Sequence, residues 1–339
     1  MRAVFITRPG GPEVLEVRES ADPKPRSGEV RVRVRAAGLN FAEVMARQGL
    51  YPDAPRFPCV VGYEASGVVD ALGPGVSGPA PGTRVMAMTR FGAHADVLCV
   101  PAAQAIPMPE GMGFEEAAAI PVNYLTAWHM LFRVAALRPG DRVLVHMAAG
   151  GVGIAVLQLC RTVEGVLTFG TASASKHPVL REEGCAYPID YRARDWADEV
   201  RRLTGGEGVD LVLDPLGGGD TRKGYALLRE AGRLVCYGFA NLSGEGGRSY
   251  LRLATQMVRV PLFNPISLMN QNRAVAGVNM GHLWHRQELL SAEFAELMAL
   301  YARGAIRPRI AATFPLERAA DAHRCIQERQ NVGKVLLVP

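Results

Sequence analysis

A glycine-rich segment between an apolar strand and an apolar helix constrains the fold of this chain more than any other feature of its sequence. Residues 142–147 (RVLVHM) have the apolar composition of a buried strand, and residues 148–153 (AAGGVG) follow it directly. The residues after this turn repeat apolar side chains at the i, i+3, i+4 and i+7 spacing of one helix face. Strand, glycine turn and helix in this order predict the first unit of a dinucleotide-binding α/β domain.

The three glycines of this turn suit a pyrophosphate group. Gly150 and Gly151 lack a Cβ atom, so the backbone can approach a phosphate closely, and Gly153 allows the helix to pack tightly on the strand. The helix N-terminus adds unpaired N–H groups and the positive end of the helix dipole. Because a strand and a helix flank the glycines as the motif requires, we expect dinucleotide binding rather than an ordinary turn.

The residues after the second strand of this unit predict which dinucleotide is bound. An NAD-specific site places Asp or Glu about 20 residues after the glycines, where it binds the ribose hydroxyls. This chain has GTASASKH at residues 170–177 instead. Ser173, Ser175 and Lys176 offer hydroxyl groups and a cation that suit the 2′-phosphate of NADPH, although a solvated polar turn has a similar composition. We therefore expect NADP(H) as the cofactor.

The 339 residues are too many for one ordinary domain and predict two. In the first third, short β-branched segments bounded by Gly or Pro predict a compact antiparallel β domain. These segments are residues 29–38, 65–73, 83–88 and 94–100. Residues 114–132 have a helical pattern, and beyond residue 142 strands alternate with helical stretches, which predicts a parallel sheet with crossover helices. The further strands are expected at residues 165–172, 209–216, 232–239 and 273–280.

The end of the chain is expected to return to the first domain. A helical stretch at residues 287–303 precedes the apolar ending VGKVLLVP, which has the character of an edge or closing strand. Residues 241–272 are Gly-rich at first and then apolar and basic, and they give no clear pattern.

Charge and cysteine content exclude several classes of protein. The net charge is +5, but the lysines and arginines are scattered among acids, so a nucleic-acid partner is not expected. The six cysteines lie 25 or more residues apart, which argues against a disulfide framework or a zinc ribbon. No apolar run reaches the roughly 18 residues of a membrane span, and residues 1–10 lack a secretory leader. We therefore expect a cytoplasmic protein.

Several motifs spread along the chain resemble one known family. They are GLNFAEVMARQGLYP, GYEASGVVDALGPGV, AAGGVG and DPLGGGDT, which resemble the medium-chain dehydrogenase/reductase superfamily in its zinc-independent quinone oxidoreductase branch. The motifs VNYLTAW, QLCRTVE, FGTASASKH, PIDY, KGY and NVGKVLLVP resemble, more narrowly, the vesicle amine transport protein type of that branch. The resemblance implies an α/β fold with a GroES-like β-rich catalytic domain at residues 1–122. A Rossmann domain with a doubly wound parallel sheet would span residues 123–284, and residues 285–339 would complete the catalytic domain.

The resemblance also implies a cleft between the domains that holds NADPH. Matched position by position, the expected cofactor contacts are Asn40, Thr126, Gly150, Gly151, Val152, Gly170, Thr171, Ser173, Lys176, Tyr191, Leu216, Gly217, Tyr237, Gly238, Asn331 and Lys334. Tyr191, in the PIDY motif, is similar to a tyrosine that flanks the adenosine phosphate in relatives. An ordinary strand-end aromatic residue is the alternative for Tyr191.

No metal is expected. A zinc alcohol dehydrogenase of the same superfamily would have Cys at the position of Asn40, His at the position of Tyr63, and a four-cysteine lobe, and this sequence has none of them. Tetrahedral zinc needs three or four ligands in one place, and the seven histidines form no such group. His282 and His285 are three residues apart and are expected to face solvent. Met45 also stands where many quinone oxidoreductases have Tyr.

Conjugate hydride delivery is the chemistry that remains without a metal. NADPH would reduce a quinone or the C=C bond of an α,β-unsaturated carbonyl compound, with the protein orienting the reactants and excluding water. By resemblance to enoyl reductases, Tyr51 would lie beside the substrate as a proton donor, and Asn40 would hold the nicotinamide ribose or an enolate oxygen. Tyr63 would contact the substrate or merely fill the vacated metal site. An apolar substrate is expected from the wall formed by Phe41, Met45, Tyr51 and Phe91.

A non-enzymatic function is the alternative. The same fold could bind NADPH as a regulatory protein while residues 248–268, which carry Arg248, Arg252 and Arg259 among apolar residues, dock on a lipid surface or a partner. A pocket lid or a dimer-facing helix would show the same pattern. The resemblance further implies a homodimer in which the strand at residues 273–280 pairs with its symmetry mate, which would cover an otherwise exposed sheet edge.

Overall fold

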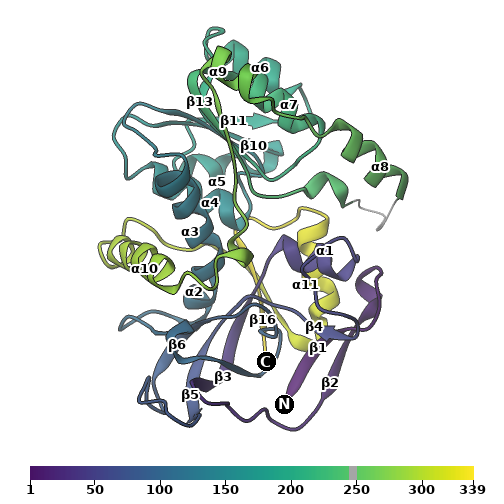
Figure 1. Ribbon diagram of the computed structural model, residues 1–339, viewed down its shortest axis with the longest axis vertical. Coiled ribbons are helices and arrows are strands. Elements are labelled where there is room, and N and C mark those ends of the chain that lie inside the picture. Colours follow the sequence, from purple (N-terminus) through teal and green to yellow (C-terminus); the bar gives the residue numbers. More distant parts are fainter. Residues whose placement is uncertain (244–249) are drawn as a thin grey trace.

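The computed structural model describes the backbone of residues 1–243 and 250–339, and the side chains of residues 1–243 and 254–339. Two bodies are visible in Figure 1. The lower body is built on the β-strands of the first third and contains both chain termini, and the upper body is a sheet covered by helices. The yellow C-terminal part of the chain runs from the upper body back into the lower one.

The β-branched segments of the first third predict a compact antiparallel β domain, and the lower body that they help to form contains two sheets. A three-stranded antiparallel sheet has the order β2-β1-β4, and a larger sheet has the order β15-β16-β3-β5-β6-β8, with β7 also paired to β3. The strands are β1 (Arg2–Ile6), β2 (Leu15–Glu19), β3 (Glu29–Leu39), β4 (Cys59–Val60), β5 (Glu64–Leu72), β6 (Arg84–Met88), β7 (Val97–Pro101), β8 (Ala105–Pro107), β15 (Ile310–Pro315) and β16 (Lys334–Val338). In β3, valines at alternate positions are buried and the intervening arginines are not, which is the period-two pattern of a strand with one face on the core.

The last strand, β16, lies inside the larger sheet. It pairs in parallel with β15 and antiparallel with β3, so the C-terminus does rejoin the first sheet. Of the two expectations for this ending, an edge strand or a closing strand, the edge strand is wrong, because β15 takes the edge position. The sequence analysis did not recognise β15. All five residues of β16 except Val338 are buried, which explains its uninterrupted apolar run.

The upper body is a six-stranded sheet in which every pairing is parallel. Its order, β11-β10-β9-β12-β13-β14, is the doubly wound Rossmann order, with the change of direction between β9 and β12. The strands are β9 (Arg142–Val145), β10 (Leu167–Ala172), β11 (Tyr187–Asp190), β12 (Val209–Asp214), β13 (Leu228–Cys236) and β14 (Ala274–Gly277). The mixed α/β fold class is confirmed.

Helices cover both faces of this sheet and bridge the two bodies (Figure 1). The helices of both bodies, in the described part of the chain, are α1 (Phe41–Arg47), α2 (Phe114–Ala119), α3 (Pro121–Trp128), α4 (Gly151–Cys160), α5 (His177–Glu182), α6 (Trp196–Leu203), α7 (Gly219–Ala226), α8 (Tyr250–Arg259), α9 (Pro265–Gln271), α10 (Gln287–Ala302) and α11 (Ala319–Gln327). The helical stretch expected at residues 114–132 is divided at Pro121, which starts α3, and its end is a π-helical turn, His129–Val134. Proline lacks the N–H group that a continuous helix would need there.

Several elements differ from the sequence prediction. The short strand β11 was missed, and β14 is only four residues long, because the chain turns away after Gly277. The unclear segment at residues 241–272 contains α8 and α9. Of the basic residues expected to dock on a lipid surface, Arg248 and the side chain of Arg252 lie outside the described residues.

Candidate functional site

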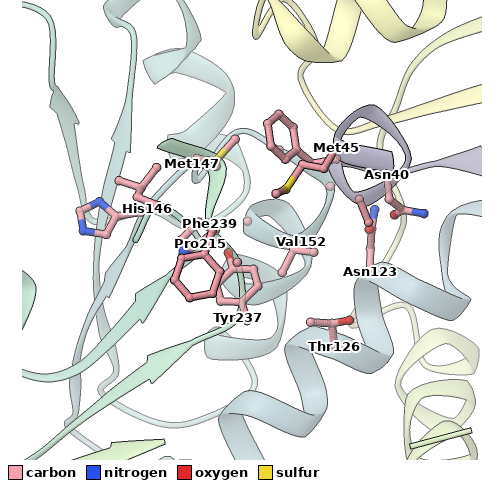
Figure 2. A pocket seen from close by; sticks show the side chains of 18 of the residues that line it. Asn40, Met45, Asn123, Thr126, His146, Met147, Val152, Pro215, Tyr237 and Phe239 are labelled. Atoms are coloured by element: carbon pink, nitrogen blue, oxygen red, sulfur yellow. The ribbon is translucent and has the colours of Figure 1, made fainter. Parts of the chain in front are cut away.

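A cavity of about 1170 Å³ lies between the two bodies, at the carboxyl ends of the parallel strands. Its wall includes residues that follow β9, β10, β12 and β13, as well as α1, the start of α3 and the beginning of β16. This is the crevice at the switch point of the strand order, where doubly wound sheets bind ligands. Figure 2 shows Asn123 and Thr126 on one helix, with Val152 and Tyr237 to their left; His146 and Met147 directly follow β9.

The glycine turn forms the middle of the cavity wall. Gly150 precedes α4 in an extended conformation, and Gly151 and Gly153 lie in its first turn. A Cβ atom on Gly153 would come within 2.5 Å of the backbone oxygen of Ala148, so only glycine lets the helix lie this close to the strand end. A Cβ atom on Gly151 would be 2.0 Å from the Nδ2 atom of Asn123. The first N–H groups of α4 have no partner within the helix. Because Gly150 and Gly151 have no side chains, the cavity beside these N–H groups is left open for an anionic group.

One end of the cavity is rich in cations. The ammonium of Lys176 donates to the backbone oxygens of Arg329 and Asn331, at 2.6 and 2.8 Å, and burial lowers its pKa. The guanidinium groups of Arg329 and Arg192 lie 5.9 and 6.0 Å from the ring centre of Tyr191. Burial raises the pKa of the Tyr191 phenol, but the two arginines outweigh this effect and lower it overall. This end therefore suits an anionic group.

The loop after β12 is fixed by the buried carboxylate of Asp214. Its Oδ1 atom accepts hydrogen bonds from the N–H groups of Leu216 and Gly217, at 2.8 and 3.2 Å, and its Oδ2 atom accepts one from Thr221 at 2.5 Å. Gly217 and Gly218 both have positive φ, 77° and 64°. The DPLGG motif thus gives the loop a shape in which Leu216 lines the cavity.

The other end of the cavity is backed by a buried group of polar residues. Asn40 caps α1, and its backbone N–H donates to Glu43 at 2.8 Å. The side-chain amide of Asn40 reaches Glu43 and Glu64 at 3.3 and 3.2 Å, and its oxygen accepts a 2.6 Å hydrogen bond from Lys334. Lys334 also pairs with Glu64 and lies 3.4 Å from the oxygen of Asn123. Asn40 is therefore held rigidly at the cavity wall.

Two tyrosines lie beside this group. The rings of Tyr51 and Tyr63 meet edge to face with centres 6.4 Å apart, and Phe91 packs behind Tyr63 at 5.2 Å. Burial raises the pKa of both phenols, so each keeps its proton near neutral pH. Tyr51 and Tyr63 line the cavity together with Phe41 and Met45, whereas the expected wall residue Phe91 does not line it.

A contact between distant segments closes the cavity next to Tyr51. The Nε2 atom of His282 lies 2.8 Å from Oδ2 of Asp53, and Asn279 donates to the same oxygen at 3.4 Å. His282, expected to face solvent only, is exposed but pairs across the cleft. All three residues line the cavity.

The structure brings most of the expected site residues together. Those that line the cavity are Asn40, Tyr51, Tyr63, Thr126, Gly150, Gly151, Val152, Thr171, Ser173, Lys176, Tyr191, Leu216, Tyr237, Gly238, Asn331 and Lys334. Gly170 and Gly217 do not. A Cβ atom on Gly170 would lie 2.7 Å from the sulfur of Cys185, and one on Gly217 would lie 2.6 Å from the ring of Phe239, so both positions serve packing.

Sequence reasoning missed other residues of the site. Asn123 lies inside the VNYLTAW motif and Arg329 just before NVGK, so both were close to recognised motifs. Glu43 and Glu64 were also inside quoted motifs, but only folding shows that they face the same lysine. His146 lies at the end of β9, with Nδ1 3.1 Å from the hydroxyl of Thr171.

The part of the chain that the structure describes contains neither a cluster of metal ligands nor a helix suited to span a membrane. In residues 1–243 and 250–339 no group of three or more His, Cys, Asp or Glu side chains is placed to hold a metal ion. Of the helices in the same part of the chain, none combines the length and apolarity that crossing a membrane requires.

Comparison with family models supports the two-part architecture. Residues 26–110 match the model described as the alcohol dehydrogenase GroES-like domain. Residues 184–337 match the model described as zinc-binding dehydrogenase. The first match covers most of the large β-sheet of the lower body, and the second covers the later part of the Rossmann sheet and the return of the chain.

Individual proteins are similar over the whole chain. The synaptic vesicle membrane protein VAT-1 homolog of Rattus norvegicus is 50% identical over 100% of this chain and 84% of its own length. The structure of Escherichia coli quinone oxidoreductase complexed with NADPH has a TM-score of 0.88 at 29% identity, covering 100% of both chains. That of CurK enoyl reductase has a TM-score of 0.85 at 26% identity, covering 99% of this chain and 98% of the other. The chain therefore belongs to the medium-chain dehydrogenase/reductase family of oxidoreductases, in the branch that contains the VAT-1 homologues.

Proposed function

We propose that this protein is an NADPH-dependent reductase of quinones or of the C=C bond of α,β-unsaturated carbonyl compounds. One observation carries the proposal: a single cavity runs from the cationic end at Lys176, past the glycine turn, to the apolar end at Tyr51. The similar structures bear the names of a quinone oxidoreductase with NADPH and of an enoyl reductase. Both reactions deliver a hydride to an electron-poor, largely apolar substrate.

The cavity fits a phosphorylated dinucleotide. The cradle at Gly150 and Gly151 and the free N–H groups of α4 would hold the pyrophosphate. Ser173, Lys176 and the neighbouring Arg329 would hold the 2′-phosphate, and Tyr191 would lie beside it. The remaining proposed cofactor contacts are Asn40, Thr126, Val152, Thr171, Leu216, Tyr237, Gly238, Asn331 and Lys334, and Gly170 and Gly217 are no longer among them because they do not line the cavity. The reduced cofactor supplies the hydride when bound, and no metal is part of the proposal.

Tyr51 is the proposed proton donor. Its phenol lies at the apolar end of the cavity, and burial keeps it protonated near neutral pH, so it can hydrogen-bond a substrate carbonyl and give up its proton as charge develops. Asn40 has a positioning role at this end, because its amide is already bonded to Glu43, Glu64 and Lys334. The phenol of Tyr63 is buried against Tyr51 and interacts with it, which favours packing beside Tyr51, with a substrate contact as the alternative.

Replacing Tyr51 tests this assignment. We expect Tyr51→Phe to lower kcat with a quinone or enone by on the order of 10²-fold, the usual effect of losing a general acid. The dissociation constant for NADPH should stay nearly unchanged, because the glycine turn and the cationic end at Lys176, which would hold the phosphates, are not altered. Turnover is followed by the loss of the reduced cofactor's absorbance, and binding by its fluorescence.

Tyr301→Phe is the matched control, since it removes a phenol that bonds to Glu116 and does not line the cavity. Wild-type turnover from Tyr51→Phe would remove Tyr51 from the mechanism. Absence of turnover by the wild-type protein on a panel of quinones and enones, despite tight NADPH binding, would favour the regulatory alternative.

The remaining expectations belong to the same proposal. We infer that two copies of the chain form a homodimer by pairing at the free edge of β14. We also infer that the domain boundaries lie after residues 122 and 284. A cytoplasmic location also stays a prediction.

A lipid contact at α8 and α9 is the second candidate function, supported by Val258, Leu262 and Met269, which are 84%, 98% and 70% exposed. Tight binding to liposomes together with negligible turnover would favour it.

A further inference from the structure

The buried polar group behind Asn40 contains more acid than base. We call Asn40, Glu43, Glu64, Asn123 and Lys334 the acid–lysine cluster. Its two carboxyl groups are 0% exposed and its ammonium is 3% exposed. Two buried carboxylates facing one ammonium would leave an uncompensated negative charge, which is costly away from water.

The hydrogen bonds show which carboxyl group is less well compensated. Glu64 pairs directly with Lys334 and also accepts a 2.6 Å hydrogen bond from the backbone N–H of Val122. Glu43 forms no ion pair with Lys334; it accepts hydrogen bonds from the backbone and side chain of Asn40 and from its own backbone N–H. Burial raises the pKa of Glu43 to about 7, although the charge of Lys334 opposes the rise. Of the two carboxyl groups, Glu43 is therefore the one whose negative charge is less well compensated.

The titratable groups around Glu43 come from several elements. The charges of Lys334 on β16 and Glu64 on β5 shift the pKa of Glu43, and the charge of Glu43 in turn raises the pKa of the Tyr51 and Tyr63 phenols. On its own helix, Arg47 is buried beside His323 of the packed helix α11. Burial holds the pKa of His323 well below its ordinary value, so this histidine is neutral near pH 7 and does not follow the titration of Glu43.

The cluster is placed to influence whatever occupies the end of the cavity near Tyr51. Asn40, Asn123 and Lys334 line the cavity, with the two acids directly behind them. Gly333, the neighbour of Lys334, forms a bridge with Gly150 of the glycine turn. If the 2′-phosphate lies at Lys176 and the pyrophosphate at this turn, as the proposed function requires, the nicotinamide half extends toward the cluster.

We propose that Glu43 is a proton-sensing positioning residue whose ionisation favours the oxidised cofactor over the reduced one. The inference rests on the proposed function. The oxidised nicotinamide ring is a cation and the reduced ring is neutral, so a negative charge behind Asn40 stabilises the former. When Glu43 is protonated this attraction is lost. The proton exchanges with solvent, and no bond of the cofactor is involved.

The test is direct binding of NADP⁺ and NADPH between about pH 6 and pH 8.5, a range that spans the titration of Glu43. In the wild-type protein we expect the affinity for NADP⁺ relative to NADPH to rise by about threefold to tenfold across this range, as for a partly screened charge pair. Glu43→Gln imitates the protonated acid and keeps an acceptor for Asn40. In this variant the ratio should stay at its low-pH value throughout.

Glu116→Gln is the matched control, because Glu116 bonds to Tyr301 outside the cavity. In Glu116→Gln, the ratio of the affinities for NADP⁺ and NADPH should change with pH as it does in the wild type. A second readout needs no cofactor: carboxyl ¹³C signals of the wild-type protein should include one group that titrates near neutral pH and is absent from Glu43→Gln.

The outcomes are distinct. If both nucleotides bind and their affinity ratio is independent of pH in the wild type, or changes equally in Glu43→Gln, the inference is wrong and the proposed function stands. If neither nucleotide binds, both are wrong. Should Glu43→Gln fail to fold, a wild-type ratio that does not change with pH would still overturn the inference.

Discussion

At the scale of single residues, Glu43 links the chemistry of the cavity to the stability of the fold. Its pKa in the folded protein is about 7, above the ordinary value of 4.5, because burial penalises the charged form. The native state therefore binds this proton more tightly than the unfolded chain does. The contribution of Glu43 to the free energy of unfolding is therefore fully present below about pH 4.5 and is lost as the pH rises through 7.

Glu43→Gln should accordingly be more stable than the wild type at alkaline pH. A shift of this size predicts an increase in the free energy of unfolding of ~2–3 kcal/mol at about pH 8, falling below ~1 kcal/mol at about pH 5. Urea unfolding of the two proteins at both pH values measures it. A difference that does not depend on pH would show that the Glu43 carboxyl group is not protonated in the native state.

The site residues that sequence could identify are those fixed by local patterns. Gly150, Gly151 and Gly153 follow from a strand, a turn and a helix that are contiguous in the chain, and Lys176 from its place after the next strand. The acid–lysine cluster could not be found in this way. Its members come from α1, β5, α3 and β16, and the bond between Lys334 and Asn40 spans 294 residues.

At the scale of elements, the sheet edges show the limits of pattern reading most clearly. Central strands such as β9 and β12 are mostly apolar and almost entirely buried, and they were predicted to within two residues of their observed ends. The edge strands β11 and β15 have mixed burial, so their periodicity is weak and both were missed. β14 was placed correctly but predicted too long.

The free edge of β14 leads to the prediction for oligomeric state. Among the residues that the structure describes, β14 pairs only with β13, on one side, and Ala274 at its start is exposed. An open edge of this kind favours pairing with a second copy of the chain. Light scattering should therefore give twice the mass of one chain.

Ala274→Lys should shift the population toward single chains, since a charged side chain on an edge strand discourages pairing and the exposed position tolerates it. Lys24→Ala, a change at an exposed position in the β-rich body, should leave the mass unaltered. A wild-type mass near that of one chain would contradict the dimer.

At the scale of the whole molecule, function depends on how two bodies meet. The apolar end of the cavity comes from the β-rich body and α1, and the glycine turn comes from the Rossmann sheet. The C-terminal part of the chain ties them together, through Lys334 at one end of the cavity and the backbone of Arg329 and Asn331 at the other. The pair of domains was foreseeable from alternating patterns, but the closure of the cleft by Asp53 and His282 was not, because it joins residues 229 positions apart.

The central claim is that this cleft binds NADPH with its 2′-phosphate at Lys176. The most direct measurement is the dissociation constants of NADPH and NADH for the wild-type protein, for Lys176→Glu, and for the exposed control Lys24→Glu. We predict that the wild type and the control prefer NADPH by at least about tenfold, roughly the effect of one charge-assisted hydrogen bond, and that Lys176→Glu loses this preference. Equal affinities of the wild type for the two cofactors, or an unchanged preference in Lys176→Glu, would contradict the account.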